Sequence, residues 1–281
     1  MSPIRRVLTA SALVAATVAF TTSIGAFPAI GDPTWAPAAT ATIHPGVETI
    51  TGGAGQCTAN FIFFNASDIF IGQAAHCAGT GAATDTNGCT AGTLPEGTTA
   101  VEIGGASQPG VMVYSSWVRM QAAGESDPDT CQFNDFALVR IHPADHDLVN
   151  PSVPFFGGPT GLATSTSTLQ QVYSYGNSSL RLGLSPLSPK FGVSLGADSG
   201  GWNHPVYTLT PGIPGDSGSG FLDSEGNAFG VLATLQVLPY PAGNGVSDLA
   251  LALDYTHTHS GPAAELEPGT EPFTPRPVPI G

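Results

Sequence analysis

Three short polar motifs carry side chains that can together activate a hydroxyl group. His76 precedes Cys77 at the end of one apolar run, Asp135 stands at the start of another, and Ser217 lies in the glycine-rich segment 215–220. A serine hydroxyl becomes a strong nucleophile only when a base takes its proton and a third group orients that base. The three motifs therefore predict nucleophilic catalysis, provided that the fold brings them together.

The elements that must position these motifs have the pattern of short β-strands. Apolar runs alternate with clusters of Gly, Asn, Asp and Ser, and the runs include 60–64, 69–72, 100–103, 111–114, 136–141, 171–175 and 229–235. This pattern is typical of antiparallel barrels and sandwiches. One helix is expected, over 248–259, with Ser247 as its N-cap and Asp248 in its first turn. The sequence predicts an all-β protein with a short C-terminal helix.

The four cysteines predict two disulfide bonds. The runs 58–64 and 69–75 flank the turn-forming residues 65–68, and an antiparallel hairpin centred there places Cys57 opposite Cys77. Cys89 and Cys131 are then left to pair with each other. The cysteines are scattered and have no C-x-x-C spacing, so we expect no metal site at them.

Composition and charge restrict the class of protein. The chain has 281 residues, of which 41% are hydrophobic and 10% are charged, with 36 Gly and 25 Pro, as expected for a globular protein rich in turns. Lys and Arg number 7 against 21 Asp and Glu, which gives a formal net charge of −14. Nucleic acid is not an expected partner, because neutralising phosphates requires clustered Lys and Arg.

The start of the chain resembles an export signal. Arg5 and Arg6 precede the apolar run 7–20, and cleavage is expected after Ala26, so residues 1–26 form a signal peptide. The paired arginines leave both the general and the twin-arginine export routes open. Because the apolar run is shorter than the ~20 residues that span a bilayer, we expect a secreted protein without a stable membrane anchor. Export also permits disulfide bonds.

Two further segments differ in composition from the body. Residues 27–42 are rich in Ala, Pro and Thr and are interpreted as a linker or pro-segment. Residues 261–281 contain many prolines and almost no apolar pattern, and are interpreted as a disordered tail. The folded body is therefore expected over 43–260.

The three motifs together resemble those of chymotrypsin-fold (trypsin-like) serine peptidases. The resemblance rests on Ala-Ala-His-Cys at 74–77, Asn-Asp-Phe-Ala-Leu at 134–138 and Gly-Asp-Ser-Gly at 215–218, in the family's chain order. It covers about 43–259 and is closest to secreted bacterial members. It implies two six-stranded antiparallel β barrels with the active site in the cleft between them.

The resemblance also assigns roles. His76 would be the general base, Asp135 would orient it, and Ser217 would attack the carbonyl, while the backbone N–H groups of Gly215 and Ser217 would form the oxyanion hole. The expected activity is that of a monomeric serine endopeptidase that acts on proteins or peptides without a cofactor or metal. A catalytically silent binding protein of the same fold and an esterase remain as alternatives.

Two ambiguities concern the serine and its neighbour. A second Asp-Ser-Gly-Gly surrounds Ser199, but Ala197 replaces the glycine before the aspartate, so Ser217 is preferred and Ser199 is expected in a surface turn. In the family, the aspartate at the position of Asp216 has a cationic partner, which is either a new N-terminus or a side chain. The candidates in this chain are Ile43 as the terminus, or Arg140, Arg181 or Lys190.

The resemblance further places Pro211, Ala233, Thr234 and Leu235 at the substrate pocket. Pro211 stands where trypsin-type members have an acid, and Leu235 where many have a glycine. We therefore expect a preference for small or apolar residues before the cut. Ala233 stands where the family usually has a serine that contacts the catalytic aspartate, so one support for Asp135 is expected to be missing.

Overall fold

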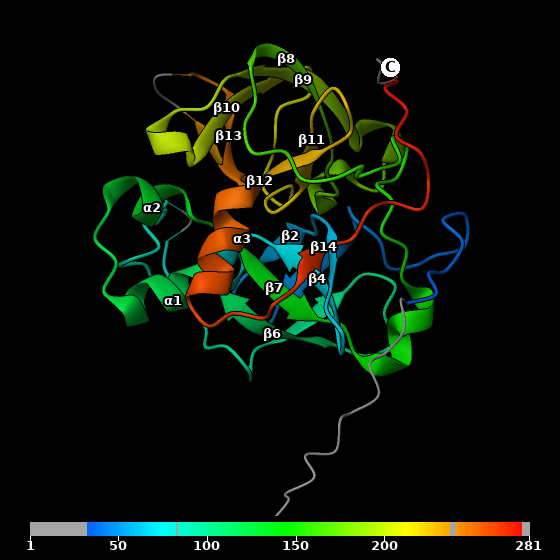
Figure 1. Ribbon diagram of the computed structural model, residues 1–281, viewed down its shortest axis with the longest axis horizontal. Coiled ribbons are helices and arrows are strands. Elements are labelled where there is room, and N and C mark those ends of the chain that lie inside the picture. Colours follow the sequence, from blue (N-terminus) through cyan, green and yellow to red (C-terminus); the bar gives the residue numbers. More distant parts are fainter. Residues whose placement is uncertain (1–32, 83, 237–239, 277–281) are drawn as a thin grey trace, which may run out of the picture.

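Two antiparallel sheets make up the body of the protein, and they lie one above the other in Figure 1. The computed structural model describes residues 33–82, 84–236 and 240–276. The expected signal peptide over 1–26 lies outside the described residues. Most of the described chain is in strands and turns with few helices, and this confirms the predicted all-β class.

The first sheet has eight strands in the spatial order β14-β3-β4-β7-β6-β5-β1-β2. Their bounds are Glu48–Thr51 (β1), Gln56–Thr58 (β2), Ile62–Phe64 (β3), Ile69–Gln73 (β4), Ala100–Ile103 (β5), Gly110–Ser115 (β6), Ala137–Arg140 (β7) and Glu265–Leu266 (β14). Strands β2 and β3 are two parts of one extended stretch. Between them Ala59 donates its N–H to Val47 O (2.9 Å), next to β1, and Asn60 donates to Gly72 O (2.8 Å) in β4. The stretch thus bonds to both sides of the sheet and curls it towards a barrel.

The second sheet is a closed barrel of six strands in the order β10-β13-β12-β11-β8-β9, as predicted. The bounds are Thr168–Tyr175 (β8), Pro189–Leu195 (β9), Asn203–Thr208 (β10), Gly220–Leu222 (β11), Ala228–Gln236 (β12) and Gly243–Asp248 (β13). Each sheet has its own buried apolar cluster. A further cluster, with Phe63 and Phe136 from the first sheet and Tyr173 and Leu222 from the second, packs the two together.

The helices differ in part from the expectation. Helix α3 (Leu249–Thr258) is confirmed, but its N-cap is Asp248, whose carboxylate accepts from Leu251 N (2.7 Å), while Ser247 stays in β13. The expectation of one helix is wrong, because α1 (Ser116–Ala123) and α2 (Pro128–Phe133) precede β7. Both are too short to show a periodic apolar face. None of the helices in the described ranges has the length and apolar character needed to cross a membrane.

Short 3-10 turns complete the fold, with bounds Ala75–Ala78 (η1), Pro143–Leu148 (η2), Ser179–Arg181 (η3), Ser185–Leu187 (η4) and Ser199–Gly201 (η5). In Figure 1, α3 lies where the two sheets meet, with α1 and α2 beside it. Its buried side chains Leu249, Ala252 and Leu253 belong to the cluster shared by both sheets. The helix therefore helps to set the position of one sheet against the other.

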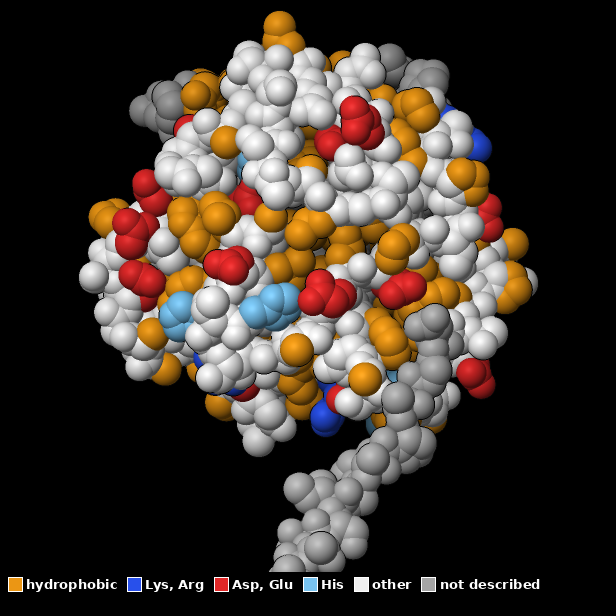
Figure 2. Space-filling model, viewed as in Figure 1, with side chains coloured by type: hydrophobic (Ala, Val, Ile, Leu, Met, Phe, Trp, Pro, Cys, Tyr) orange, Lys and Arg blue, Asp and Glu red, His pale blue; other side chains and the backbone are white. Residues whose placement is uncertain are grey.

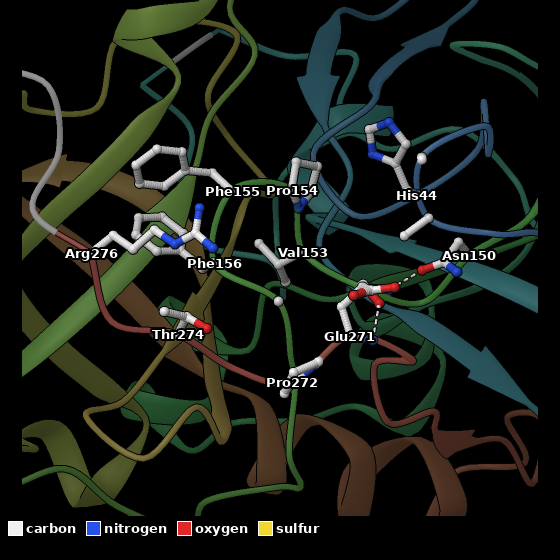
Figure 3. Close-up of a pocket in the computed structure, with 14 residues that line it drawn as sticks. His44, Asn150, Val153, Pro154, Phe155, Phe156, Glu271, Pro272, Thr274 and Arg276 are labelled. Carbon is white, nitrogen blue, oxygen red and sulfur yellow. Dashed lines mark hydrogen bonds between the residues drawn. The ribbon is translucent and has the colours of Figure 1, made fainter.

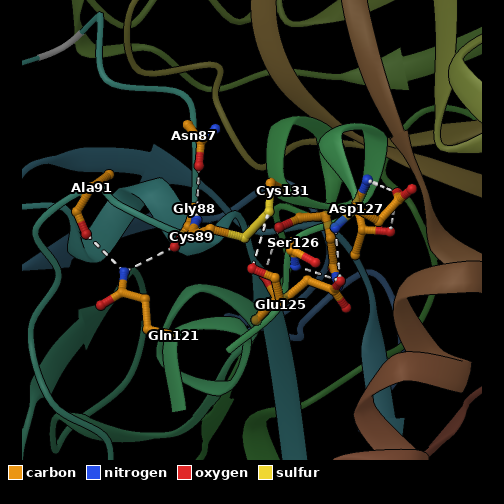
Figure 4. The surroundings of a disulfide bond; sticks show 12 residues. Asn87, Gly88, Cys89, Ala91, Gln121, Glu125, Ser126, Asp127 and Cys131 are labelled. Carbon is orange, nitrogen blue, oxygen red and sulfur yellow. Dashed lines mark hydrogen bonds between the residues drawn. A yellow bond between two sulfur atoms is a disulfide. The ribbon is translucent and has the colours of Figure 1, made fainter. Parts of the chain in front are cut away.

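Both predicted disulfides are present, Cys57–Cys77 and Cys89–Cys131. The second ties the segment around Cys89 to α2, and Gln121 of α1 adds to this link by donating to Gly88 O and Ala91 O, each at 2.8 Å (Figure 4). The bridge therefore joins a long loop to the helix that leads into β7.

The described parts of both terminal segments pack on the body, contrary to the expectation of a disordered tail. Trp35 packs against the first core, and its Nε1 donates to Glu267 Oε1 (3.2 Å). Strand β14 pairs with β3, and the chain then continues to the second barrel (Figure 1). There the ring of Phe273 lies 5.4 Å from that of Tyr173. The prolines stop helix formation, but edge pairing and one aromatic anchor hold the tail in place.

A cavity of about 530 Å³ lies among the terminal segments and the connection between the sheets (Figure 3). Its walls include His44, Asn150, Phe155 and Glu271, and the guanidinium of Arg276 lies 5.8 Å from the Phe155 ring centroid. It contains none of the predicted catalytic residues.

Replacing Phe273 with Ala tests the docking of the tail. We expect the free energy of unfolding to fall by about 2 kcal/mol, less than for a fully buried Phe because the ring is half-buried. Urea denaturation followed by fluorescence measures the change. Thr274→Ala, an exposed neighbour, is the control and should be neutral; equal stability of the two variants would contradict the docked tail.

Candidate active site

A cleft of about 590 Å³ contains side chains from both sheets. His76 and Asp135 line it from the first sheet, and Ser217 and the β12 residues Leu232–Leu235 line it from the second. The structure thus brings the three predicted catalytic residues into one cavity, although they are far apart in the sequence.

His76 is held at two points by Asp135. It lies in η1, directly after the buried strand β4, and the disulfide at Cys77 ties this turn to β2. The His76 backbone N–H donates to Asp135 Oδ1 (2.8 Å), and its Nδ1 pairs with Asp135 Oδ2 (2.6 Å). Burial lowers the pKa of His76, but the charge of Asp135 and this hydrogen bond outweigh it, so the pKa lies above its ordinary value.

The backbone on either side of Asn134 positions Asp135, which is 5% exposed. Ser116 Oγ in α1 donates to Asn134 O (2.8 Å). Ser247 in β13 donates its hydroxyl to Phe133 O and accepts from Asp135 N (3.4 Å). The second barrel therefore supports the aspartate through Ser247. Sequence reasoning missed this role, since the position of Ser247 before α3 indicated only a helix cap.

Ser217 lies in a tight turn after Pro214. The backbone N–H of Asp216 donates to Ile213 O (2.9 Å), and its backbone carbonyl accepts from Ser219 N (3.0 Å). The carbonyl of Ser217 accepts from Thr58 N (2.8 Å). Gly215 has φ +95° and Gly218 has φ +86°, and a Cβ on Gly218 would lie 2.6 Å from Thr58 O. Glycine is therefore required at both positions.

Two backbone donors in this turn have no acceptor. Within the described chain, the N–H groups of Gly215 and Ser217 make no hydrogen bond. Two unpaired donors with one residue between them can receive an oxygen that gains negative charge. The Ser217 hydroxyl is also without a hydrogen bond among the described residues, so no bond links it to His76; such bonds are often long in substrate-free sites.

Two cations hold the carboxylate of Asp216, which is fully buried. Arg181 forms an ion pair with Oδ2, and Lys190 Nζ lies 3.0 Å from the same atom. Ser178 N donates to Oδ1 (3.2 Å) and Ile213 N to Oδ2 (3.1 Å). Burial lowers the pKa of Lys190 below its ordinary value, although Asp216 opposes this. The carboxylate is thus neutralised by side chains of the second barrel.

The other two candidate partners of Asp216 lie elsewhere. Arg140 pairs with Asp68 on the surface (4.0 Å). Ile43 is buried in the first core, where its N–H bonds to Leu148 O (3.1 Å). Ile43 therefore does not supply the partner of Asp216 in this structure.

The predicted substrate pocket is placed only in part. Ala233, Thr234 and Leu235 line the cleft, but Pro211 does not. Pro211 is exposed, and its carbonyl accepts from Lys190 Nζ (3.3 Å). Residues 212–214, which follow Pro211, line the cleft instead.

Asn244, which sequence reasoning missed, also lines this part of the cleft. Its Nδ2 donates to Val206 O (3.3 Å) and Thr208 Oγ1 (3.0 Å), and its Oδ1 accepts from Gly212 N (2.8 Å). Both the nitrogen and the oxygen of the Asn244 amide are therefore hydrogen-bonded within the protein. No signal in the sequence marks it, because an isolated Asn in a strand has many roles.

Two other groups of residues do not form a second site. Ser199 lies in η5 with φ +49° and does not line the cleft. Cys57, His76 and Cys77 bring potential ligand atoms within 4.8 Å of one another. Both sulfurs are in a disulfide, so they cannot act as thiolate ligands for a metal.

Comparison with solved structures supports the fold. A Glu endopeptidase is 18% identical over 82% of this chain and 98% of its own, with a TM-score of 0.51. Thermobifida fusca protease A is 18% identical over 81% of this chain and 99% of its own, with a TM-score of 0.49. A Nocardiopsis protease is 19% identical over 80% of this chain and 98% of its own, with a TM-score of 0.43.

No family model and no curated protein matches the chain. The likeness to the Glu endopeptidase, together with the closed barrel and the curled first sheet, shows the two-sheet chymotrypsin-like fold. The all-β chymotrypsin-like class implied by the sequence resemblance is therefore confirmed, and the first of the two expected six-stranded barrels is a curled sheet of eight strands.

Replacing Arg181 with Met tests the ion pairs at Asp216. The variant leaves a buried carboxylate with one cation fewer, and we expect a loss of about 3 kcal/mol in the free energy of unfolding. Arg140→Met, which removes a surface pair, should cost less than about 1 kcal/mol. Urea denaturation of both variants measures the difference, and similar losses would contradict the assignment of Arg181.

Proposed function

We propose that the protein is a serine endopeptidase that hydrolyses peptide bonds through an acyl-enzyme. The observation that carries this proposal is the pairing of His76 with Asp135 at two points, in the same cleft as Ser217 and two unpaired backbone donors. A base, a group that orients it, a hydroxyl and an oxyanion site are the parts that acyl transfer requires.

The reaction follows from these positions. Ser217 Oγ attacks the peptide carbonyl while His76 Nε2 takes its proton, and Asp135 stabilises the resulting imidazolium. The negative oxygen of the tetrahedral intermediate accepts from the N–H groups of Gly215 and Ser217. His76 then protonates the leaving amine, the C–N bond breaks, and the Ser217 ester is hydrolysed by a water that His76 activates in the same way.

The ion pairs of Asp216 keep the oxyanion site in shape. Asp216 lies between the two donor residues, so its buried pairing with Arg181 and Lys190 sets the direction of both N–H groups. Loss of one such donor costs about 2.7 to 4 kcal/mol in the reaction barrier. Because side chains supply both cations, we infer that this site forms without a new N-terminus.

The pocket supports a preference for small or apolar residues before the cut. Its walls at 212–214, 232–235 and Asn244 contain no charged side chain, and the amide of Asn244 is fully engaged. Leu235 at the rim is largely exposed. A charged substrate side chain would find no partner there, whereas an apolar one would lose water-exposed area.

We further propose that the protein acts outside the cell. Two disulfides agree with an oxidising compartment, and the predicted signal over 1–26 agrees with export. Acidic side chains recur across the face in Figure 2, whereas basic ones are seen mainly at its edges. This charge does not favour nucleic acid as a partner.

A catalytically silent binding protein is the second candidate, and one observation favours it. The Ser217 hydroxyl has no hydrogen bond to His76 among the described residues. Without that bond in the substrate complex, the serine would stay a weak nucleophile. An esterase would need the same activated serine, so only its substrate range would separate it from a peptidase.

Labelling with a fluorophosphonate followed by peptide mapping tests the proposal. The reagent reacts with a serine only when a base activates it, so we expect label on Ser217 in the folded, secreted protein and none in Ser217→Ala. Ser199→Ala is the matched control and should label like the wild type. Unlabelled folded protein would favour the silent binding protein, and cleavage of esters without peptides would favour the esterase.

The pH dependence of kcat/KM gives a second prediction. His76 must be neutral to take the proton, and its pKa lies above the ordinary 6.5, so activity should fall on acidification with a midpoint above pH 6.5. Asp135→Asn removes the charge that raises this pKa and leaves burial, which lowers it. The midpoint of the residual activity should therefore move to lower pH; a midpoint that stays in place would contradict the role of Asp135.

A further inference from the structure

The connection between β8 and β9 presents four leucines to solvent. In the leucine segment, defined as residues 178–188, the residues Leu180, Leu182, Leu184 and Leu187 are 63, 87, 57 and 36% exposed. Backbone bonds from Leu182 N to Ser179 O and from Leu187 N to Leu184 O, both 3.0 Å, give the segment a defined shape. The segment is therefore an exposed apolar surface with a defined backbone conformation.

The backbone of Leu182 is in a strained conformation. It has φ +53°, in the left-handed region that a leucine rarely adopts. Backbone strain of this kind concentrates at functional sites. A residue that is both strained and almost fully exposed contributes little to folding, which points to a role in binding.

The base of the leucine segment is bonded to the candidate active site. Ser178 Oγ donates to Pro214 O (2.5 Å), and Arg181 pairs with Asp216. Ser179 Oγ donates to Gln56 Oε1 (2.5 Å), and Gln56 lines the cleft. The segment is therefore continuous with the cleft through Gln56 and the turn that carries Ser217.

The position of Gln56 indicates which part of a substrate reaches the segment. Residues 232–235 and residues 54–57 both line the cleft that contains Ser217, and Gln56 lies beside the Ser217 turn, because a Cβ on Gly215 would be 3.2 Å from Gln56 Nε2. The proposed function assigns the residue before the cut to the β12 wall, and we assign the leaving-group part to the wall at 54–57. That wall leads to the leucine segment.

The charge of the region favours a polypeptide over a lipid surface. Between Asp147 and Asp198 the chain has no Asp or Glu, although its net charge is −14. The cation in the segment, Arg181, is buried in its ion pair and cannot attract anionic lipid headgroups. An apolar side chain of a peptide can bind without an acidic or a basic partner.

We propose that the leucine segment binds apolar side chains of the substrate downstream of the bond that is cut. The proposal rests on the proposed peptidase function and extends it to the leaving-group side. Substrates would then be polypeptides with an apolar stretch after the cleavage point, and short substrates without that stretch would not use the surface.

The test compares two peptides that are identical up to the cut and carry either Leu and Phe or Ser and Gly after it. We expect at least about fivefold higher kcat/KM for the apolar peptide, from partial burial of two side chains. In Leu182→Gly with Leu184→Ser this advantage should disappear, while hydrolysis of a short substrate with a chromogenic amine stays unchanged. Glycine tolerates the backbone of Leu182, so the first change should not lower stability.

Leu169→Gly is the matched control. Leu169 is 70% exposed and has φ +64°, like Leu182. It lies at the start of β8, about 20 Å of strand away from the end that leads into the leucine segment. This variant should keep the preference for the apolar peptide, and loss of the preference in it would overturn the proposal.

Binding to Ser217→Ala separates this proposal from the peptidase proposal. Fluorescence anisotropy should show tighter binding of the apolar peptide, lost in the leucine variant, even if the wild type cleaves nothing. Equal affinity for both peptides would overturn the proposal. Two other results would also overturn it, because each would assign the surface to another occupant. One is sedimentation with phosphatidylcholine vesicles that the leucine variant loses, and the other is a dimer in analytical ultracentrifugation that the leucine variant loses.

Discussion

The buried carboxylate of Asp216 is the group on which the rest of the site depends. An unpaired charge at that depth would be strongly unfavourable, so Arg181 and Lys190 must remain beside it. Through these contacts the turn that carries Ser217 is joined to the barrel wall and to the carbonyl of Pro211. The directions of the backbone donors, the shape of the pocket wall and the base of the leucine segment therefore follow from one electrostatic constraint.

The second requirement is that the two sheets keep their relative position, because His76 and Ser217 come from different sheets. A shared apolar cluster, helix α3 and the tail from β14 to Phe273 all connect them. Ser247 adds a polar link, since its hydroxyl reaches the backbone before Asp135. Packing sets the distance between the sheets, and hydrogen bonds set the orientation of the residues at their boundary.

Local patterns in the sequence predicted much of this arrangement. The hairpin around residues 65–68 was sufficient to pair Cys57 with Cys77, because the register of a short hairpin depends on neighbouring residues. Helices α1 and α2 were missed because their apolar periodicity is weak. The tail was misjudged because its composition resembles that of disordered segments, whereas its docking depends on β3 and Tyr173, which are remote in the sequence.

The sequence by itself determined the all-β class, the closing helix, the two disulfides and the residue types available for catalysis. These depend on short-range spacing and on side-chain chemistry, which the order of residues states directly. Only the tertiary structure decided that Arg181 and Lys190, and not Arg140 or Ile43, surround Asp216, that Pro211 does not line the cleft, and that Ser247 supports Asp135. Each of these outcomes depends on which distant strands become neighbours when the sheets close.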